Sequence, residues 1–158
     1  MTYSIIVSTE ETNMIDRLAL PTDAKPGPNC GLTALAVVAG VTLAEATRVY
    51  LRQYPRHPGS NWKGGTRWPY TLQAAKHLGV RYVDATPLDP RYNIRIVKRM
   101  TLKTFAKQHA GLGKRYMIRT TGHVQVLQDG WVIDQGGVKH IDEYRGAGKI
   151  VKDAVRIK

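Results

Sequence analysis

The sequence predicts an α+β fold in which the helices come first and the strands later. Segments with the apolar period of a helix lie mainly between residues 30 and 113, whereas three strand-like runs joined by short turns lie between residues 114 and 135. This order is typical of N-terminal helices packed against one side of a C-terminal antiparallel sheet. The chain has 158 residues, 42% of them hydrophobic and 23% charged, so we expect residues 1–158 to form a single domain.

The first elements are a strand, a stiff loop and a helix that begins at the only cysteine. Residues 3–7 (YSIIV) are predicted as a short strand, and residues 21–29 as a constrained loop because they hold three prolines and a glycine. A helix is expected from Cys30 to Ala39. Asn29 is a suitable N-cap residue for this helix, and Gly40 is a suitable C-cap residue.

Two further helices are expected in the first half. Residues 42–54 carry an apolar stripe at helical spacing, and Thr42 with Glu45 fits a capping box at their start. A loop rich in Pro, Gly and Trp is predicted over residues 55–69, and a third helix over residues 70–79.

The second half contains a strand, a short helix and three more strands, predicted over residues 80–85, 101–113, 114–120, 123–128 and 131–135. Two other segments, residues 91–100 and 149–158, interleave basic and apolar residues. We expect both to be strands or edge elements whose exposed face is basic.

One hairpin within these strands brings a histidine close to a carboxylate. Asp-Gly at residues 129–130 is a strong signal for a two-residue turn, which pairs Gln128 with Trp131. In this register His123 and Asp134 lie on one face as diagonal neighbours, with their side chains within reach of each other. The other face, directed toward the core, holds Val124, Val126, Trp131 and Ile133. A carboxylate beside an imidazole orients the ring and stabilises its protonated form.

Cys30 occupies a position that favours a reactive thiolate. Unpaired N–H groups at a helix N-terminus lower the pKa of a thiol, and a neighbouring imidazolium lowers it further. The small residues Gly31, Ala34 and Ala36 permit the helix to pack closely against the hairpin that carries His123. The alternative reading of Cys30 is a small buried apolar residue, which is common for a single cysteine.

The order of cysteine, histidine and aspartate resembles that of papain-like cysteine peptidases, and most closely that of their compact bacteriocin-processing type. Four segments spanning most of residues 21–136 carry the resemblance: NCGLTALAVVAG, GTRWPYTLQAAKHLG, TLKTFAKQHAGLGKRYMIRT and GHVQVLQDGWVIDQ. The resemblance implies a papain-like fold with Cys30 as nucleophile, His123 as general base and acid, and Asp134 as the residue that orients the histidine. It also implies a peptide or amide substrate, a thioester intermediate and no cofactor.

The sequence departs from this family at one position. Such peptidases usually carry a glutamine six residues before the cysteine, where it donates a hydrogen bond to the oxyanion, and this chain has Ala24 there. Losing one such donor typically costs on the order of 100-fold in rate. The backbone N–H of Cys30 and the neighbouring Asn29 are the candidate oxyanion donors that remain. Candidate residues of the substrate cleft are Trp62, Trp68 and Gly122.

The net charge of +12 points to acidic partners. Residues 60–70 interleave Trp and Tyr with Lys and Arg, a combination that stacks bases and holds phosphates in nucleic-acid-binding proteins. The alternatives are that the charge serves solubility and that the tryptophans fasten this loop to the core or form a wall of the cleft.

Several other classes of protein are disfavoured. One cysteine excludes an intramolecular disulfide and a multi-cysteine zinc site, and the spacing of His, Asp and Glu matches no metal site. The remaining histidines, which have no partner pattern, are His57, His77, His109 and His140. The N-terminus lacks the pattern of a signal peptide, and no run approaches the roughly 18 apolar residues of a membrane span. We therefore expect a cytoplasmic protein with no membrane partner.

Three hypotheses follow from the sequence. The first is a papain-like cysteine hydrolase, either a peptidase or an amidase. The second is a papain-like protein with weak or lost catalysis that binds a partner, such as nucleic acid, through its basic surface. The third is a nucleic-acid-binding module whose resemblance to peptidases is accidental; its affinity falls with salt and does not depend on Cys30.

Overall fold

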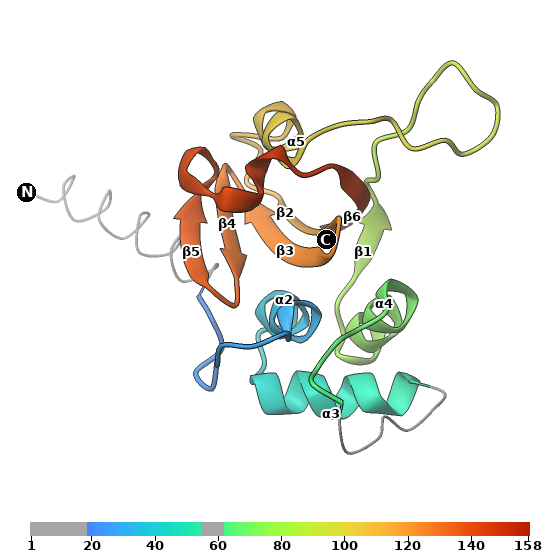
Figure 1. Cartoon of the computed structure of the whole chain (residues 1–158). Helices are drawn as coiled ribbons and strands as arrows, with labels where there is room; N and C mark the ends of the chain where they lie inside the picture. Colours follow the sequence, from blue (N-terminus) through green and yellow to red (C-terminus); the bar gives the residue numbers. More distant parts are fainter. Residues whose placement is uncertain (1–18, 55–61) are drawn as a thin grey trace, which may run out of the picture.

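The computed structural model describes residues 19–54 and 62–158. Within these residues the protein is an α+β domain with four helices and a six-stranded antiparallel sheet (Figure 1). The predicted strand over residues 3–7, His57 and residues 55–61 of the predicted loop over residues 55–69 lie outside the described residues.

The helices are α2 (Cys30–Ala39), α3 (Leu43–Gln53), α4 (Trp68–His77) and α5 (Leu102–Gln108). The strands are β1 (Tyr82–Asp84), β2 (Arg115–Thr120), β3 (His123–Gln128), β4 (Trp131–Asp134), β5 (Gly137–His140) and β6 (Val151–Ile157), and their order across the sheet is β1-β6-β2-β3-β4-β5. Two short 3-10 helices, η1 (Ile141–Glu143) and η2 (Arg145–Gly148), join β5 to β6.

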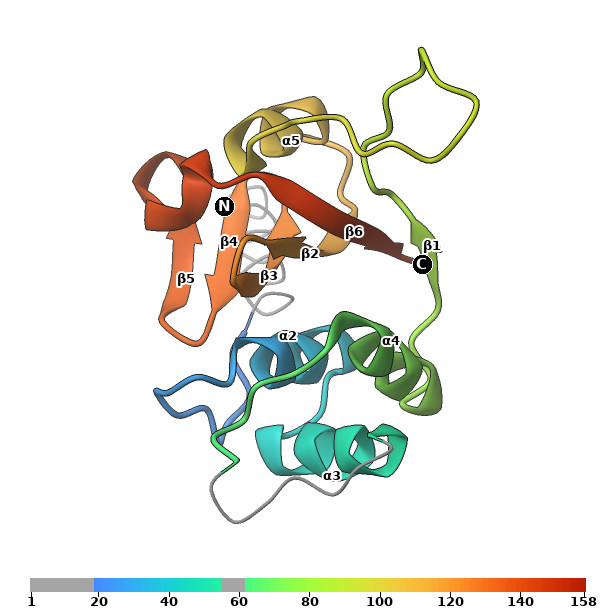
Figure 2. The ribbon, with the colours of Figure 1, turned by 45° about the vertical axis from the view of Figure 1, so that its right-hand side comes forward.

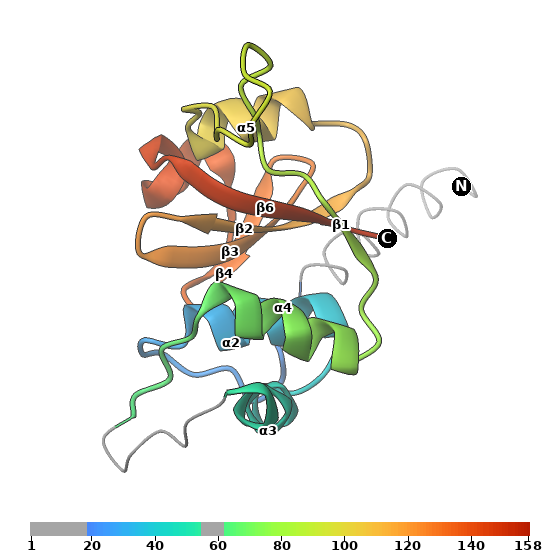
Figure 3. The ribbon, with the colours of Figure 1, turned by 90° about the vertical axis from the view of Figure 1, so that its right-hand side faces the viewer.

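Helices cover both faces of the sheet. Helices α2 and α4 lie on one face with α3 beyond them, and α5 lies on the opposite face (Figure 3). The expectation that the helices gather on one side is therefore correct for α2 to α4 and wrong for α5. Strands β2 and β3 consequently bury residues on both faces, which is why their buried residues do not alternate with exposed ones.

The core consists of three adjoining apolar clusters. An outer cluster joins α2, α3 and α4, and a second cluster joins the sheet to α5 and the 3-10 helices. Between them lies a middle cluster that fastens α2 to the sheet, formed by Ala34, Val37, Val38, Met117, Val124, Val126, Ile133 and Val155. Of the small residues expected to permit close packing, Ala34 faces the hairpin as predicted, whereas Ala36 faces α3.

Helix α2 has the predicted bounds. The residue after it, Gly40, adopts a left-handed conformation with φ of 67°, which suits a glycine C-cap. Asn29 occupies the N-cap position, but its side chain accepts no hydrogen bond from a backbone N–H of the first turn. Its side chain is buried and pairs with the Lys25 carbonyl oxygen and with the hydroxyl of Thr33.

Helix α3 begins with the predicted cap. The hydroxyl of Thr42 accepts a hydrogen bond from the backbone N–H of Glu45 at 3.1 Å. The Glu45 side chain does not close the capping box, because it pairs with Arg48 instead. The carboxylate of Asp23 accepts hydrogen bonds from the N–H groups of residues 43–44, so the loop before α2 also stabilises the start of α3.

Several predicted elements differ in the structure. Helix α4 begins at Trp68, two residues before the predicted start, because a proline is well tolerated in a first turn. Residues 91–100 form no regular strand: they belong to a loop that extends away from the domain (Figure 2). A bridge between Leu88 and Val97 and an ion pair between Arg95 and Asp84 help to hold this loop. The basic segment at residues 149–158 does form a strand, β6, which is one of the two predicted alternatives, and it lies inside the sheet between β1 and β2.

Among the described residues, no single helix has the length and apolar character needed to cross a membrane. Helices α2 and α3 meet that length and composition only when taken together, and they are bent by 109° at their junction.

Candidate active site

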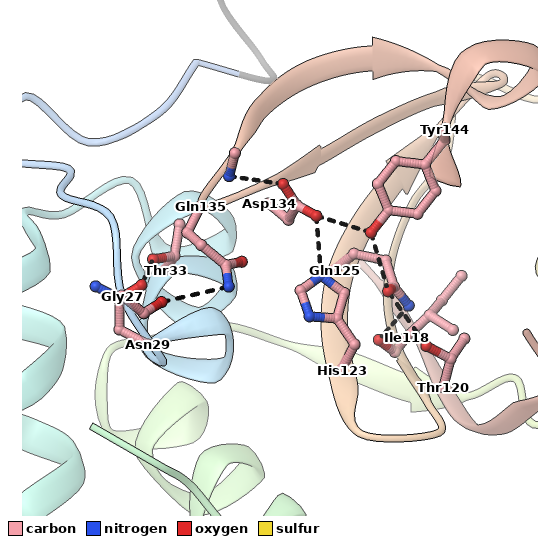
Figure 4. A network of polar contacts seen from close by, with 11 residues as sticks. Gly27, Asn29, Thr33, Ile118, Thr120, His123, Gln125, Asp134, Gln135 and Tyr144 are labelled. Carbon is pink, nitrogen blue, oxygen red and sulfur yellow. Dashed lines mark hydrogen bonds and ion pairs between the residues drawn. The ribbon is translucent and has the colours of Figure 1, made fainter. Parts of the chain in front are cut away.

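The predicted hairpin brings His123 and Asp134 into direct contact. Its ladder pairs Gln128 with Trp131 and continues to Val126 and Ile133, which confirms the predicted register. The imidazole Nε2 of His123 lies 2.9 Å from Oδ2 of Asp134 (Figure 4). One part of the hairpin prediction is wrong: Trp131 is 39% exposed and packs edge-on against a histidine of β5 rather than in the core.

Asp134 is held by three hydrogen-bond donors. Besides the contact with His123, its Oδ1 accepts from the backbone N–H of Gly136 at 2.8 Å, and its Oδ2 accepts from the hydroxyl of Tyr144 at 2.8 Å. Burial raises the pKa of the carboxyl, but these donors outweigh burial and hold the pKa below its ordinary value. Asp134 is therefore an anion at neutral pH, in a fixed orientation.

The hydroxyl of Tyr144 donates to this carboxylate and stays protonated. Burial and the adjacent Asp134 raise the pKa of the phenol. The same hydroxyl lies 3.4 Å from Oε1 of Gln125, whose amide nitrogen donates to the carbonyl oxygen of Ile118 at 2.9 Å (Figure 4). Tyr144 follows η1, so this short helix positions the histidine indirectly, through the aspartate.

His123 is protonated over most of the physiological pH range. Hydrogen bonds to Asp134 and to Cys30 raise its pKa to about 9, although burial acts in the opposite direction. Because Nε2 is committed to Asp134, Nδ1 is the nitrogen left to face the thiol. In Figure 4 this second nitrogen points away from Asp134 and toward the side of α2.

Cys30 is the first residue of α2 and is partly buried against the middle cluster. Burial raises the pKa of its thiol. A hydrogen bond with His123, the backbone N–H of Val124 and the charge of His123 outweigh burial, so the pKa lies below its ordinary value. The structure thus brings the three predicted residues to one site: Cys30 and His123 line the same cleft, and the imidazole of His123 pairs with the carboxylate of Asp134.

A cleft of about 380 Å³ opens above the sulfur and the imidazole. Its lining includes Cys30, His123 and the predicted cleft residue Gly122, which has a φ of 70° in the turn between β2 and β3. The opposite wall is formed by residues 64–66. This wall lies close to the start of α2 because Gly31 has no side chain: a Cβ there would lie 2.0 Å from Oγ1 of Thr66.

Neither tryptophan proposed for the cleft lines it. Trp62 stacks on Tyr50, with ring centroids 6.3 Å apart and planes inclined by 5°. It lines a separate cavity of about 1010 Å³, which meets the first cleft along residues Pro28 and Gly64. Trp68 lies in the first turn of α4, against the middle cluster. The two side chains fasten their loop to the helices, which was the alternative reading of this segment.

The other described histidines have local roles. His109 contacts the hydroxyl of Tyr116 at 3.0 Å, and His140 accepts a hydrogen bond from the backbone N–H of Asp142. Within residues 19–54 and 62–158, no three His, Cys, Asp or Glu side chains gather as they would around a metal ion.

The structure adds two residues that the sequence did not single out. Tyr144 contacts Asp134, and Gln135 lines the same cleft as Cys30 and His123. Gln135 directly follows Asp134 in the sequence, so its place near the site could have been predicted from the sequence. No sequence pattern pointed to Tyr144. This residue is far from Asp134 in the sequence, and only the fold of β5 and η1 brings the two side chains together.

A scan against models of protein families, a search of curated proteins and a search of solved structures each returned no match to this chain.

Proposed function

We propose that this protein is a papain-like cysteine hydrolase that cleaves a peptide or another amide. The observation that carries the proposal is the grouping of Cys30 and His123 in one open cleft, where the imidazole also pairs with the carboxylate of Asp134 at 2.9 Å. A buried structural cysteine needs neither a protonated imidazole nor a cleft above its sulfur.

The arrangement supports acyl transfer in two steps. The Cys30 thiolate attacks the carbonyl carbon, forming a carbon–sulfur bond and an oxyanion. As the oxyanion collapses, the carbon–nitrogen bond breaks, and His123 transfers the proton on Nδ1 to the departing amine. A thioester to Cys30 remains.

In the second step neutral His123 takes a proton from water, and the resulting hydroxide attacks the thioester. The carbon–sulfur bond breaks, the acid leaves, and the thiolate–imidazolium pair is restored. Throughout, Asp134 keeps the ring oriented and stabilises its protonated form, as its hydrogen bond to Nε2 requires.

The test is the pH dependence of alkylation of Cys30 by iodoacetamide. Because the chain holds one cysteine, the signal has no competing thiol. In the wild type we expect an apparent pKa well below that of a free thiol, and in His123→Ala a rise toward roughly 8.5. His77→Ala is the matched control, because this exposed histidine lies on α4, away from the cleft. A thiol that titrates normally in both wild type and His123→Ala would refute the proposal.

A second candidate function, binding of nucleic acid, is favoured by the loop that extends from the domain. It exposes Tyr92 and Ile94, by 50% and 71%, beside the exposed cations Lys98 and Arg99. Aromatic stacking combined with cations suits single-stranded nucleic acid. Titration of a fluorescent single-stranded oligonucleotide at several salt concentrations tests this function. A log-linear fall of affinity with salt that weakens in Lys98→Ala would support it, and the absence of binding at low salt would exclude it.

A further inference from the structure

We propose that Gln135 donates the second hydrogen bond to the oxyanion, in the role that the family resemblance gives to a glutamine at the position of Ala24. The inference rests on the proposed hydrolase function and adds a catalytic residue to it. The donor then comes from the end of strand β4 in the sheet rather than from the loop before the nucleophile.

The position of Gln135 fits this role. It follows Asp134 at the end of β4 and lines the same cleft as Cys30 and His123. In Figure 4 its amide extends from the strand across to the loop that precedes α2, where Nε2 lies 3.5 Å from the carbonyl oxygen of Gly27. The backbone N–H of Cys30, the first residue of α2, has no acceptor within the helix. The two donors therefore belong to residues that line the same cleft.

The amide of Gln135 is also only weakly engaged. A donor–acceptor distance of 3.5 Å lies outside the usual range for an N–H···O hydrogen bond, so its loss costs little. Its Oε1 is buried and has no hydrogen-bond partner among the described residues. The unpaired Oε1 is an acceptor and does not interact with an oxyanion, whereas the exposed Nε2 is a donor that can leave its long contact for a better acceptor. An oxyanion offers Nε2 a charged acceptor, which is a stronger partner than a neutral carbonyl.

The other candidates are less suitable. Ala24 has no donor, and the side chain of Asn29 is 4% exposed. The amide nitrogen of Asn29 donates to the Lys25 carbonyl oxygen at 3.1 Å, and its oxygen pairs with the Thr33 hydroxyl at 3.2 Å. Turning Asn29 toward the cleft would break both of these contacts, one of them buried. The predicted oxyanion role thus remains with the backbone of Cys30 and passes from Asn29 to Gln135.

Two reactions of the same sulfur separate this inference from the proposed function. Acylation by 4-nitrophenyl acetate passes through an oxyanion and releases 4-nitrophenolate as the thioester forms, so its initial burst reports the oxyanion donors. Alkylation by iodoacetamide forms a carbon–sulfur bond without an oxyanion, so it reports only the thiolate and His123. Both rates are measured on the wild type, on Gln135→Ala and on Gln135→Glu. Gln73→Ala, which removes an exposed glutamine on α4, is the control.

We expect acylation to fall on the order of 100-fold in both Gln135 variants, while alkylation stays within about twofold of the wild type. Unchanged alkylation also shows that the variants are folded.

Three results would overturn the assignment. Acylation within about threefold of the wild type in Gln135→Ala shows that Gln135 is not a donor. A parallel fall of both rates shows that it acts on the cysteine and histidine pair. A wild type that alkylates at low pH but gives no burst has no functional oxyanion site. A wild-type thiol with ordinary titration instead refutes the hydrolase itself, and the assignment with it.

Discussion

Replacing Asp134 by Asn removes the charge that holds His123 protonated, and the effect can be measured as a change in stability with pH. The pKa of His123 is raised from its ordinary 6.5 to about 9, which at about 1.4 kcal/mol per pH unit corresponds to roughly 3 kcal/mol in favour of the folded protein with a protonated ring. The side chain is 20% exposed, so solvent screens this interaction only in part. The largest single contribution is the hydrogen bond to Asp134, followed by that to Cys30.

The sign of the effect follows from the direction of the shift. A group whose pKa is raised on folding contributes its full stability below its unfolded pKa, here about 6.5, and loses it as the pH rises through about 9. Cys30 has a lowered pKa, so its contribution is present above its unfolded pKa and is lost as the pH falls. The two contributions change in opposite directions, and the experiment is therefore done with Cys30→Ala in the background.

The assay is urea unfolding of Cys30→Ala and of Cys30→Ala with Asp134→Asn, at pH 6 and at pH 9.5. We expect the first protein to lose on the order of 1–2 kcal/mol between the two pH values, because Asp134 still raises the pKa of His123. The second should lose less than about half of that amount. The titration of Asp134 itself falls well below this window, because its pKa is lowered. Equal losses in the two proteins would refute the conclusion that Asp134 sets the protonation of His123.

Two further predictions concern the residues around the site. Gly31→Ala is expected to destabilise the protein by about 1–3 kcal/mol in urea unfolding, since the new Cβ would lie 2.0 Å from a stiff Thr66 side chain. Gly65→Ala, where a Cβ meets nothing within 4 Å, should change stability little, and an equal loss in both variants would contradict the close-approach argument. Tyr144→Phe removes the 2.8 Å hydrogen bond to Asp134 and should cost about 1 kcal/mol. It should change the pKa of His123 measured by NMR less than Asp134→Asn does, and a drop as large as that of Asp134→Asn would refute the supporting role assigned to Tyr144.

The parts of the site that the sequence could predict are those set by local chemistry. The bounds of α2 can be predicted because a proline-rich loop precedes the helix and a glycine follows it. These residues fix the two ends of the helix whatever the rest of the fold. The contact between His123 and Asp134 follows from the turn at residues 129–130, whose φ angles of 49° and 84° are those that an Asp-Gly pair tolerates. Once the turn is placed, the period of a strand decides which side chains share a face.

The parts that it could not predict depend on contacts between distant segments. Residues 91–100 alternate like a strand, but no partner strand reaches them, so they form a loop. Strand β5 has four residues and little apolar alternation, which gives too weak a pattern to predict. The exposure of Trp131 follows from its position beside β5, and the contact of Tyr144 with Asp134 follows from η1. Asn29 lies at the start of α2, as predicted. Its side chain, however, donates a hydrogen bond to the Lys25 carbonyl oxygen in the preceding loop, a contact that the sequence did not indicate.

The middle cluster between α2 and the sheet has a consequence for the tolerance of the site to mutation. The sulfur is carried by α2 and the imidazole by β3, so the distance between them is maintained by the apolar side chains packed between these two elements. Reactions of this kind can lose about 100-fold in rate when the reacting groups move by 1 Å. Removing a methyl group from Val126 would thus change the alignment of the sulfur and the imidazole. Removing one from the cluster around α5 would mainly lower the stability of the fold. For the proposed hydrolase, the packing of the middle cluster therefore sets the distance between the sulfur and the imidazole.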